Sequence, residues 1–299
     1  MSTTATYPLS SATLPSPWRL TAVGVGFSLL WSSAFIAGKV GLAVSGPLTL
    51  LALRFTLAGL LLLGWMTLSG RPVGRPRDLA AAVGAGLLSN AVYLGLAYLG
   101  LKHLPAALTA IIVSTTPLLT TAAGAIWQRE AFGLRRSLGL ALAFGAVVLI
   151  MSQRLRLGGT PLGPVLLIGA GTLALVVGTL LNRHVAGRND PWTVATWQLL
   201  AAGLALLPVA AAVEGLHFVA GTAFFSSLLY QAGPVSIGTT LALLWLVKHG
   251  GASKGSSFHL LSPFFSTGLA VALLGETLLP FDLIGLIPLV LGMALVLRR

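Results

Sequence analysis

Long apolar runs follow one another along most of the chain, and short segments with glycine, proline and basic residues separate them. A helix that crosses a membrane needs about 20 predominantly apolar residues. The pattern predicts ten transmembrane helices, at residues 20–38, 47–68, 79–99, 104–126, 136–152, 163–182, 192–212, 220–246, 252–274 and 281–297. The run over 220–246 is the most irregular of these, because Gly233, Pro234 and Gly238 interrupt it.

The composition agrees with this pattern. Hydrophobic residues make up 56% of the 299 residues and charged residues 8%, whereas a typical soluble domain has about 25% charged residues. Such a chain cannot cover a water-facing surface, so lipid must surround most of it. We therefore expect an all-α polytopic membrane protein in contact with the lipid bilayer.

Lysine and arginine are distributed unequally between the two sides of the predicted helices. With the N-terminus inside, 13 of them lie on the cytoplasmic side and four on the other side, while Arg54 lies within a helix. Cytoplasmic loops carry an excess of Lys and Arg, so both termini are expected in the cytoplasm. Residues 1–17 have no charged side chain and are rich in Ser, Thr and Pro, which indicates a disordered cytoplasmic tail rather than a signal peptide.

The chain also repeats itself. A shift of 144 residues places 47–63 on 191–207 and matches Ala58-Gly59-Leu60 with Ala202-Gly203-Leu204. A shift of 146 residues matches Lys102-His103 with Lys248-His249, Pro117 with Pro263, Glu130 with Glu276 and Gly139-Leu140 with Gly285-Leu286. Such matches in a constant register are hard to obtain by chance, so we infer a duplication.

Each half of the duplication has five predicted helices, an odd number, so the second half enters the membrane from the opposite side. We expect one repeat over 18–152 and an inverted repeat over 163–299, a 5+5 architecture. The segment around Glu130 has three arginines and its counterpart around Glu276 has no Lys or Arg, as inversion requires. Inverted repeats are typical of secondary transporters, whose substrate sites lie near the midplane between the halves.

Several classes of function are disfavoured by the sequence. The basic residues form no stripe with interleaved aromatics, so no nucleic-acid partner is expected. The chain has no cysteine, which excludes disulfides and thiolate chemistry. It has neither an HExxH motif nor a pair of buried acids, so an intramembrane enzyme is a lesser alternative, and we expect no cofactor and no metal. A structural or signalling membrane protein stays open; it predicts a dry interface between the halves.

Four segments carry a family resemblance: LLWSSAFIAGKV (29–40), RFTLAGLLLL (54–63), LKHLPAALTAIIVSTTPLLTTAAGAIWQRE (101–130) and SSFHLLSPFFSTGLAVALLGETL (256–278). In these the chain resembles the drug/metabolite transporter superfamily, EamA type, and among its branches the bacterial amino-acid exporters, including exporters of aromatic amino acids. The resemblance implies ten helices around a central cavity, alternating access and a place in the bacterial inner membrane. Family members export amino acids and other metabolites, or move nucleotide sugars.

Arg54 is the most unusual residue of the predicted helices. An arginine at the centre of a span costs about 2.5–3.5 kcal/mol on insertion scales, and every acidic residue falls at a helix end or in a loop. Two interpretations are open: Arg54 is a structural anchor satisfied by carbonyls, hydroxyls or water, or it faces the cavity and meets a substrate carboxylate. The second half has Gln198 at the equivalent position, so the symmetric scaffold does not demand an arginine.

Polar residues deep in a span need a polar surface to face. We expect about half of them to line the cavity, because a lone polar group more often bonds to a neighbouring helix. Lys39 either anchors its helix at the interface or closes one mouth of the cavity, with Ser32 on the same helical face. The candidate substrate-binding residues are Ser32, Lys39, Asn90, Tyr93, Thr116, Asn182, Trp197, Gln198, His259 and Ser262.

Two pairs of residues related by the duplication suggest structural or gating roles. Pro117 and Pro263 each remove a backbone hydrogen bond and kink a helix, and paired kinks allow the rocking that alternating access needs. Glu130 and Glu276 are expected to cap neighbouring helix N-termini.

The absence of an intramembrane carboxylate bears on the mechanism. The small multidrug-resistance relatives use an intramembrane glutamate to exchange protons for cations, and none exists here. We therefore predict uncoupled export of amino acids or similar small metabolites by a monomer. The alternative is a proton-coupled exporter of drugs or other metabolites, in which His259 carries the proton, since histidine titrates near neutrality.

Overall fold

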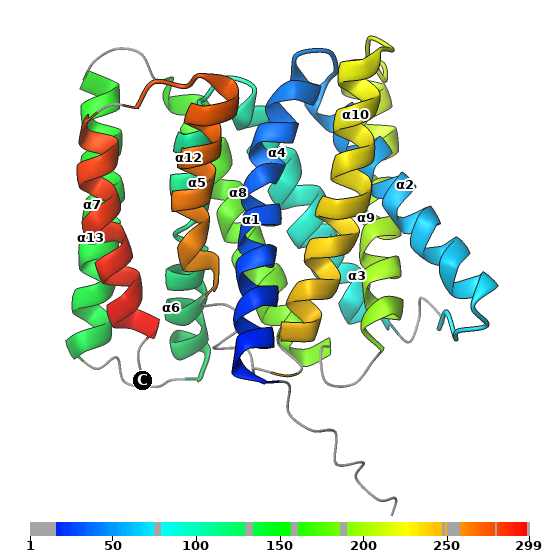
Figure 1. Ribbon diagram of the computed structural model, residues 1–299, viewed down its shortest axis with the longest axis horizontal. Coiled ribbons are helices and arrows are strands. Elements are labelled where there is room, and N and C mark those ends of the chain that lie inside the picture. Colours follow the sequence, from blue (N-terminus) through cyan, green and yellow to red (C-terminus); the bar gives the residue numbers. More distant parts are fainter. Residues whose placement is uncertain are drawn as a thin grey trace, which may run out of the picture.

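The computed structural model describes residues 16–74, 79–128, 134–156, 161–185, 190–246, 249, 258–278 and 280–297. Within these ranges no β-strand occurs, and one isolated antiparallel bridge joins Ser45 and Phe218. The all-α prediction is confirmed for this part of the chain (Figure 1). The predicted N-terminal tail lies outside the described residues except for its last two.

The helices of the first half are α1 (Pro17–Leu42), α2 (Pro47–Leu68), α3 (Ala80–Gly86), the π-helix η2 (Leu87–Val92), α4 (Tyr93–Leu101), α5 (Ala106–Val113), α6 (Thr116–Gln128) and α7 (Leu134–Arg156). Those of the second half are α8 (Leu162–Val185), α9 (Pro191–Glu214), α10 (Thr222–Tyr230), the π-helix η3 (Gln231–Gly238), a helical stretch at 239–246, the 3₁₀-helix η4 (Phe258–Leu261), α12 (Ser262–Leu274) and α13 (Pro280–Leu297).

These helices have the composition of a multi-pass membrane protein. Among the described residues, six helical spans are long and apolar enough to cross a membrane: 18–42, 47–68, 80–101, 106–124, 162–182 and 191–214. Shorter apolar helices cover 137–150, 262–274 and 280–292. Large apolar side chains on the outside of the bundle, such as Leu68, Val148 and Leu229, are more than half exposed, as expected of a surface that faces lipid.

Helix boundaries follow proline, glycine and acidic residues. Pro47 and Pro191 open α2 and α9 at a position where a missing N–H is tolerated. Asp190 caps α9 by accepting hydrogen bonds from the backbone of Trp192 and Thr193. Gly275 ends α12 in the left-handed conformation (φ 63°), which glycine adopts without steric cost.

The span predicted over 104–126 is helical at 106–113 and 116–128, and at the kink predicted from Pro117 the helix is broken. A turn at Ser114–Thr115 separates α5 from α6, because Pro117 has no N–H to donate to the carbonyl of Val113. Hydroxyl groups replace the missing bonds: Thr115 Oγ1 donates to Ile112 O (2.7 Å) and Thr116 Oγ1 to Val113 O (2.6 Å). At the equivalent place in the second half, Pro263 lies in the first turn of α12, directly after η4.

The two π-helices lie at equivalent positions of the duplication. η2 begins at Leu87 and η3 at Gln231, 144 residues later. A π segment widens one turn of a helix and changes the faces that the following residues present, and such segments are frequent at functional sites. Each half therefore carries the same local distortion in its third helical segment.

Helix packing follows a pattern of exchange between the halves. α2 packs against α9 and α7 against α13, each helix against its own counterpart. The contact of α1 with α12 has its equivalent in that of α8 with α6, and the contact of α3 with α8 in that of α10 with α1. This is the arrangement that a two-fold relation between the halves produces.

Small residues bring α2 and α9 close together. A Cβ atom at Gly59 would lie 2.8 Å from the backbone nitrogen of Leu200, and one at Gly203 would overlap the backbone nitrogen of Thr56. Close approach at small residues is the usual way in which helices pack within a membrane. The two glycines are the pair matched by the repeat in the sequence.

Two glutamates connect the halves at the end of the bundle where α9 and α12 end, which we call the acidic end and define by Glu214 and Glu276. This is the upper end in Figure 1, where α12 ends. The carboxylate of Glu214 accepts hydrogen bonds from the backbone of Leu48 (3.0 Å) and Thr49 (2.8 Å) at the start of α2. That of Glu276 accepts from the backbone of Ala106 (2.7 Å) and Ala107 (3.1 Å) at the start of α5. A carboxylate at a helix N-terminus is stabilised by the free N–H groups. The predicted capping role of Glu276 is confirmed, whereas Glu130 lies outside the described residues.

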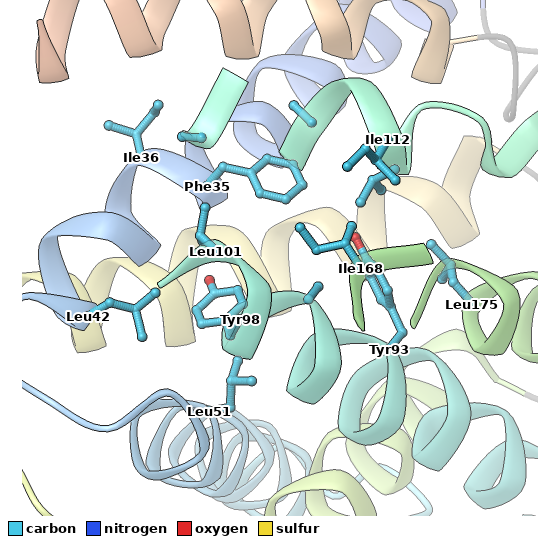
Figure 2. Close-up of a cluster of buried hydrophobic side chains, with 14 of the residues drawn as sticks. Phe35, Ile36, Leu42, Leu51, Tyr93, Tyr98, Leu101, Ile112, Ile168 and Leu175 are labelled. Atoms are coloured by element: carbon cyan, nitrogen blue, oxygen red, sulfur yellow. The ribbon is translucent and has the colours of Figure 1, made fainter. Parts of the chain in front are cut away.

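Helix α1 begins at the opposite, lower end of the bundle, and helix α13 ends there (Figure 1). Between the two ends, apolar side chains of α1, α2, α4, α5 and α8 form one continuous buried cluster. Figure 2 shows part of it, in which Tyr93 and Tyr98 lie among Phe35, Leu101 and Ile168. These tyrosines bring hydroxyl groups into the interior, next to the site described below.

Candidate functional site

Arg54 lies in the middle of α2 and is 3% exposed. Its Nε donates a hydrogen bond to Ser236 Oγ (2.8 Å), and its Nη1 donates to Tyr98 OH (3.0 Å) and to Gln231 Oε1 (3.0 Å). The guanidinium carbon lies 5.0 Å from the centre of the Phe55 ring. Three hydroxyl or amide oxygens and one aromatic face therefore surround the cation, and none of these groups carries a negative charge.

Gln231 holds this cluster in one arrangement. Its Oε1 also accepts a hydrogen bond from Tyr98 OH (2.5 Å), and its Nε2 donates to Ser227 Oγ (2.8 Å). Ser236, one turn further along η3, donates to the backbone oxygen of Gln231 (2.8 Å). Because the N–H groups of Nε and Nη1 face acceptors, the orientation of the Arg54 side chain is determined before any ligand arrives.

A small pocket opens beside this cluster. Its lining comes from both halves of the chain: Trp31, Ala34, Phe35, Arg54, Phe55, Asn90, Tyr93, Leu94, Tyr98, Leu199, Val235, Ser236, Thr239 and Thr240. Binding sites for small molecules typically have a mostly apolar lining with a few placed polar groups. This pocket has such a lining.

The charge of the pocket is unbalanced. Arg54 is the single ionised side chain among the described lining residues, and no aspartate or glutamate is among them. Groups of three or more His, Cys, Asp or Glu residues, which could hold a metal ion, do not occur in the described part of the chain. The site can therefore supply one positive charge, several hydroxyl and amide groups and an aromatic wall.

Three residues singled out in the sequence line this pocket. Arg54 comes from α2, Asn90 from η2 and Tyr93 from the start of α4. The Tyr93 side chain is fully buried, and its hydroxyl has no hydrogen-bond partner among the described residues.

Other predicted residues lie away from the lining and bond to neighbouring helices. Gln198 donates to Asn182 Oδ1 (2.6 Å), Trp197 Nε1 donates to Val73 O (2.8 Å), and Ser32 Oγ donates to Ser262 O (3.1 Å). Thr116 satisfies the carbonyl freed at the break of its own helix, as described above. The side chains of Ser32, Asn182, Trp197 and Gln198 thus have partners within the protein, as expected of polar groups in a membrane. The buried hydroxyl of Ser262 has none among the described residues.

Lys39 lies in the last turn of α1, is partly exposed and interacts electrostatically with Glu276 at the acidic end. It is not part of the pocket lining. The side chains of His259 and Pro117 lie outside the described residues. Pro263 is buried at the break before α12.

None of the residues that hold Arg54 is among those predicted from the sequence. Tyr98, Gln231 and Ser236 come from helices far apart in the sequence, and Thr239 and Thr240 follow them in the lining. Like Gln198, Gln231 is a lone amide in an apolar run, a pattern that indicates a buried polar site. The run over 220–246 is irregular because it contains Gly233 and Pro234, so Gln231 is not among the predicted residues. Tyr98 had no signal, because a tyrosine in an apolar helix is an ordinary core residue.

The comparisons with known proteins agree with this architecture. The model of the EamA-like transporter family matches the chain twice, at residues 19–152 and 162–298. A solved crystal structure is similar to the chain with a TM-score of 0.68 at 21% sequence identity, covering 93% of this chain and 96% of that one. This likeness supports the fold.

Curated relatives extend over most of the chain. The "Uncharacterized inner membrane transporter YedA" of Escherichia coli K12 is 26% identical over 90% of this chain and 87% of its own length, and the "Uncharacterized transporter YvbV" of Bacillus subtilis is 27% identical over 90% and 88%. The "Probable amino-acid metabolite efflux pump" of Salmonella typhimurium is 24% identical over 89% and 90%. With family matches over both halves, the chain belongs to the EamA-like transporter family.

Proposed function

We propose that the protein exports amino acids or similar small metabolites across the bacterial inner membrane by alternating access, without coupling to protons. The observation that carries this proposal is the pocket beside Arg54, which is built from both halves and contains a cation but no carboxylate among its described lining residues. The name of the Salmonella typhimurium relative, an amino-acid metabolite efflux pump, supports the class of substrate.

The proposal includes a 5+5 arrangement of ten transmembrane helices, with repeats over 18–152 and 163–299. The exchange of helix contacts between the halves, the equivalent π-helices and the paired glycines of α2 and α9 support it. In a pair of inverted repeats the substrate binds near the midplane, and rocking of one half against the other opens it to each side in turn.

Orientation follows from the distribution of basic residues. With both termini in the cytoplasm, the acidic end faces the outside. The contacts of Glu214 with α2 and of Glu276 with α5 then close the outer side, together with the backbone bonds from Gly46 to His217 (3.0 Å) and from Val219 to Val44 (2.7 Å). Opening to the outside requires that these contacts separate.

Uptake of labelled threonine, methionine and phenylalanine into liposomes that contain the purified protein tests this function. We expect uptake of at least one of the three, at a rate that does not change when a pH gradient is imposed. Empty liposomes are the control. Uptake that depends on the pH gradient would support the alternative, a proton-coupled exporter, and an absence of uptake for all three would contradict the amino-acid class.

A further inference from the structure

We propose that Arg54 binds a carboxylate group of the substrate directly, and that the site selects a carboxylate joined to an aromatic or branched apolar body, without requiring an amino group. This inference rests on the proposed transport function and names its substrate class more narrowly. It assigns Arg54 to substrate binding, one of the two interpretations that the sequence left open.

The positive charge of Arg54 has no negative charge to balance it among the described lining residues. A buried cation is normally paired with an anion, because the penalty for removing it from water is large. The hydrogen-bond acceptors of Arg54 are the neutral groups of Ser236, Tyr98 and Gln231, and the described pocket lining has no acid. An anionic ligand in this pocket would complete a pair that the protein leaves open.

The guanidinium group of Arg54 is oriented by the protein and keeps free donors. Ser236, Tyr98 and Gln231 use the hydrogens of Nε and Nη1, while Nη2 has no hydrogen-bond partner among the described residues. Arginine carries five N–H donors, so two remain for a ligand in the pocket that Arg54 lines. A fixed guanidinium binds a carboxylate with little further loss of side-chain entropy.

The two halves of the chain differ at the position of Arg54. At the position equivalent to Arg54, α9 has Gln198, whose amide donates to Asn182 and which does not line the pocket. The scaffold therefore closes around a neutral side chain at this position. The first half therefore supplies a cation to the pocket at this position, and the second half supplies none.

The rest of the lining determines what accompanies the carboxylate. Trp31, Phe35, Phe55 and Leu199 offer apolar and aromatic surface, and Asn90 and Thr239 offer neutral polar groups. An ammonium group that enters the pocket loses its hydration and finds no carboxylate among the described lining residues to pair with. The positive charge of Arg54 also repels it. The amino group of an amino acid therefore contributes little to affinity, whereas the carboxylate contributes much.

Three probes with the same phenyl body separate these contributions: 3-phenylpropionate, which has only the carboxylate; 3-phenylpropionamide, its neutral isostere; and phenethylamine, which has only the ammonium. Binding to the purified full chain is measured by calorimetric titration. We expect the acid to bind at least about tenfold more tightly than the amide, since a hydrogen bond to a charged group contributes about 1.5–3 kcal/mol. Phenethylamine should bind more weakly than both. Equal affinities for acid and amide, or tightest binding of the amine, would overturn the inference.

Variants locate the effect. Arg54→Gln copies the second half and should abolish the preference for acid over amide, while Arg54→Lys should restore part of it. Arg71→Gln is the matched control, because Arg71 is exposed and stacks on Trp65 outside the pocket. A folded Arg54→Gln protein that keeps the preference would contradict the proposal. Where this variant does not fold, the three probes on the unaltered protein decide the question.

The binding result and the transport result can fail separately. Phenylalanine uptake together with equal binding of acid and amide would leave the proposed function standing and remove the Arg54 inference. Selective binding of the acid without transport of any tested compound would do the reverse.

Discussion

At the residue scale, the arrangement around Arg54 shows how a membrane protein keeps a charge inside. The cost of placing an arginine in a span is offset when each N–H finds an oxygen, and three such bonds are present. Tyr98 is central to the cluster, since its hydroxyl accepts from Arg54 and donates to Gln231. Tyr93, one turn earlier, is equally buried, but its hydroxyl has no partner in the described part of the chain.

This difference gives a matched pair of substitutions. Tyr98→Phe should lower the free energy of unfolding by about 1–3 kcal/mol, because it removes a hydroxyl that satisfies buried donors and acceptors. Tyr93→Phe should be neutral or slightly stabilising, because it removes an unpaired buried group. Thermal unfolding of the purified protein in detergent measures both. Equal losses for the two variants would contradict the assigned hydrogen bonds.

At the element scale, two kinds of local feature shape the bundle. Small residues allow α2 and α9 to approach at Gly59 and Gly203, while breaks and π turns change the direction of side chains along the spans. The hydroxyl groups of Thr115 and Thr116 show that the break at Ser114–Thr115 is compensated from within its own helix. Such compensation lets a broken helix persist in lipid.

The close packing of α2 and α9 predicts a large effect from one methyl group. Gly203→Ala places a Cβ against the backbone of Thr56, which cannot move as a flexible side chain could, so we expect a loss of about 1–3 kcal/mol in unfolding free energy from overpacking. Gly64→Ala in α2 is the control, because nothing lies within 4 Å of its Cβ position. The stabilities of the two variants are compared by heating each protein and following the loss of its helical circular dichroism signal. A Gly203→Ala protein as stable as the control would mean that the two helices do not approach as described.

At the scale of the whole molecule, the ends of the bundle differ in how the halves are connected. At the acidic end, Glu214 and Glu276 of the second half cap helices of the first half. At the other end, Thr193 Oγ1 donates to Pro72 O (3.0 Å) and Trp197 Nε1 donates to Val73 O. Alternating access requires that the contacts of one end open while those of the other hold.

Orientation in the membrane is open to direct measurement, because the chain contains no cysteine to interfere. Val219→Cys places a thiol at the acidic end, and Ser69→Cys places one at the opposite end; both positions are exposed. We expect a membrane-impermeant maleimide added to intact cells to label the first variant and not the second. Both should be labelled after the cells are opened. The reverse result in intact cells would invert the proposed topology.

The sequence by itself determined the features that depend on local chemistry. Hydropathy located the helices to within a few residues, since lipid admits little else across its thickness. The matched residues of the two halves identified the duplication, and the sequence predicts Glu276 as a cap because a carboxylate at a helix N-terminus is favourable wherever it occurs. The sequence also shows that Arg54 has no acidic residue near it along the chain that could neutralise its charge.

The tertiary structure alone decided which polar groups meet. Tyr98 lies 44 residues from Arg54 along the chain, and Ser236 lies 182 residues from it. The π-helix η2 precedes the helix that contains Tyr98, and the π-helix η3 contains Ser236. Helices in lipid are apolar on every face, so their periodicity does not distinguish the face that lines a pocket from the face that meets lipid. Packing between the halves selects that face. The packing of the helices places Gln198 against Asn182 and Gln231 against Arg54.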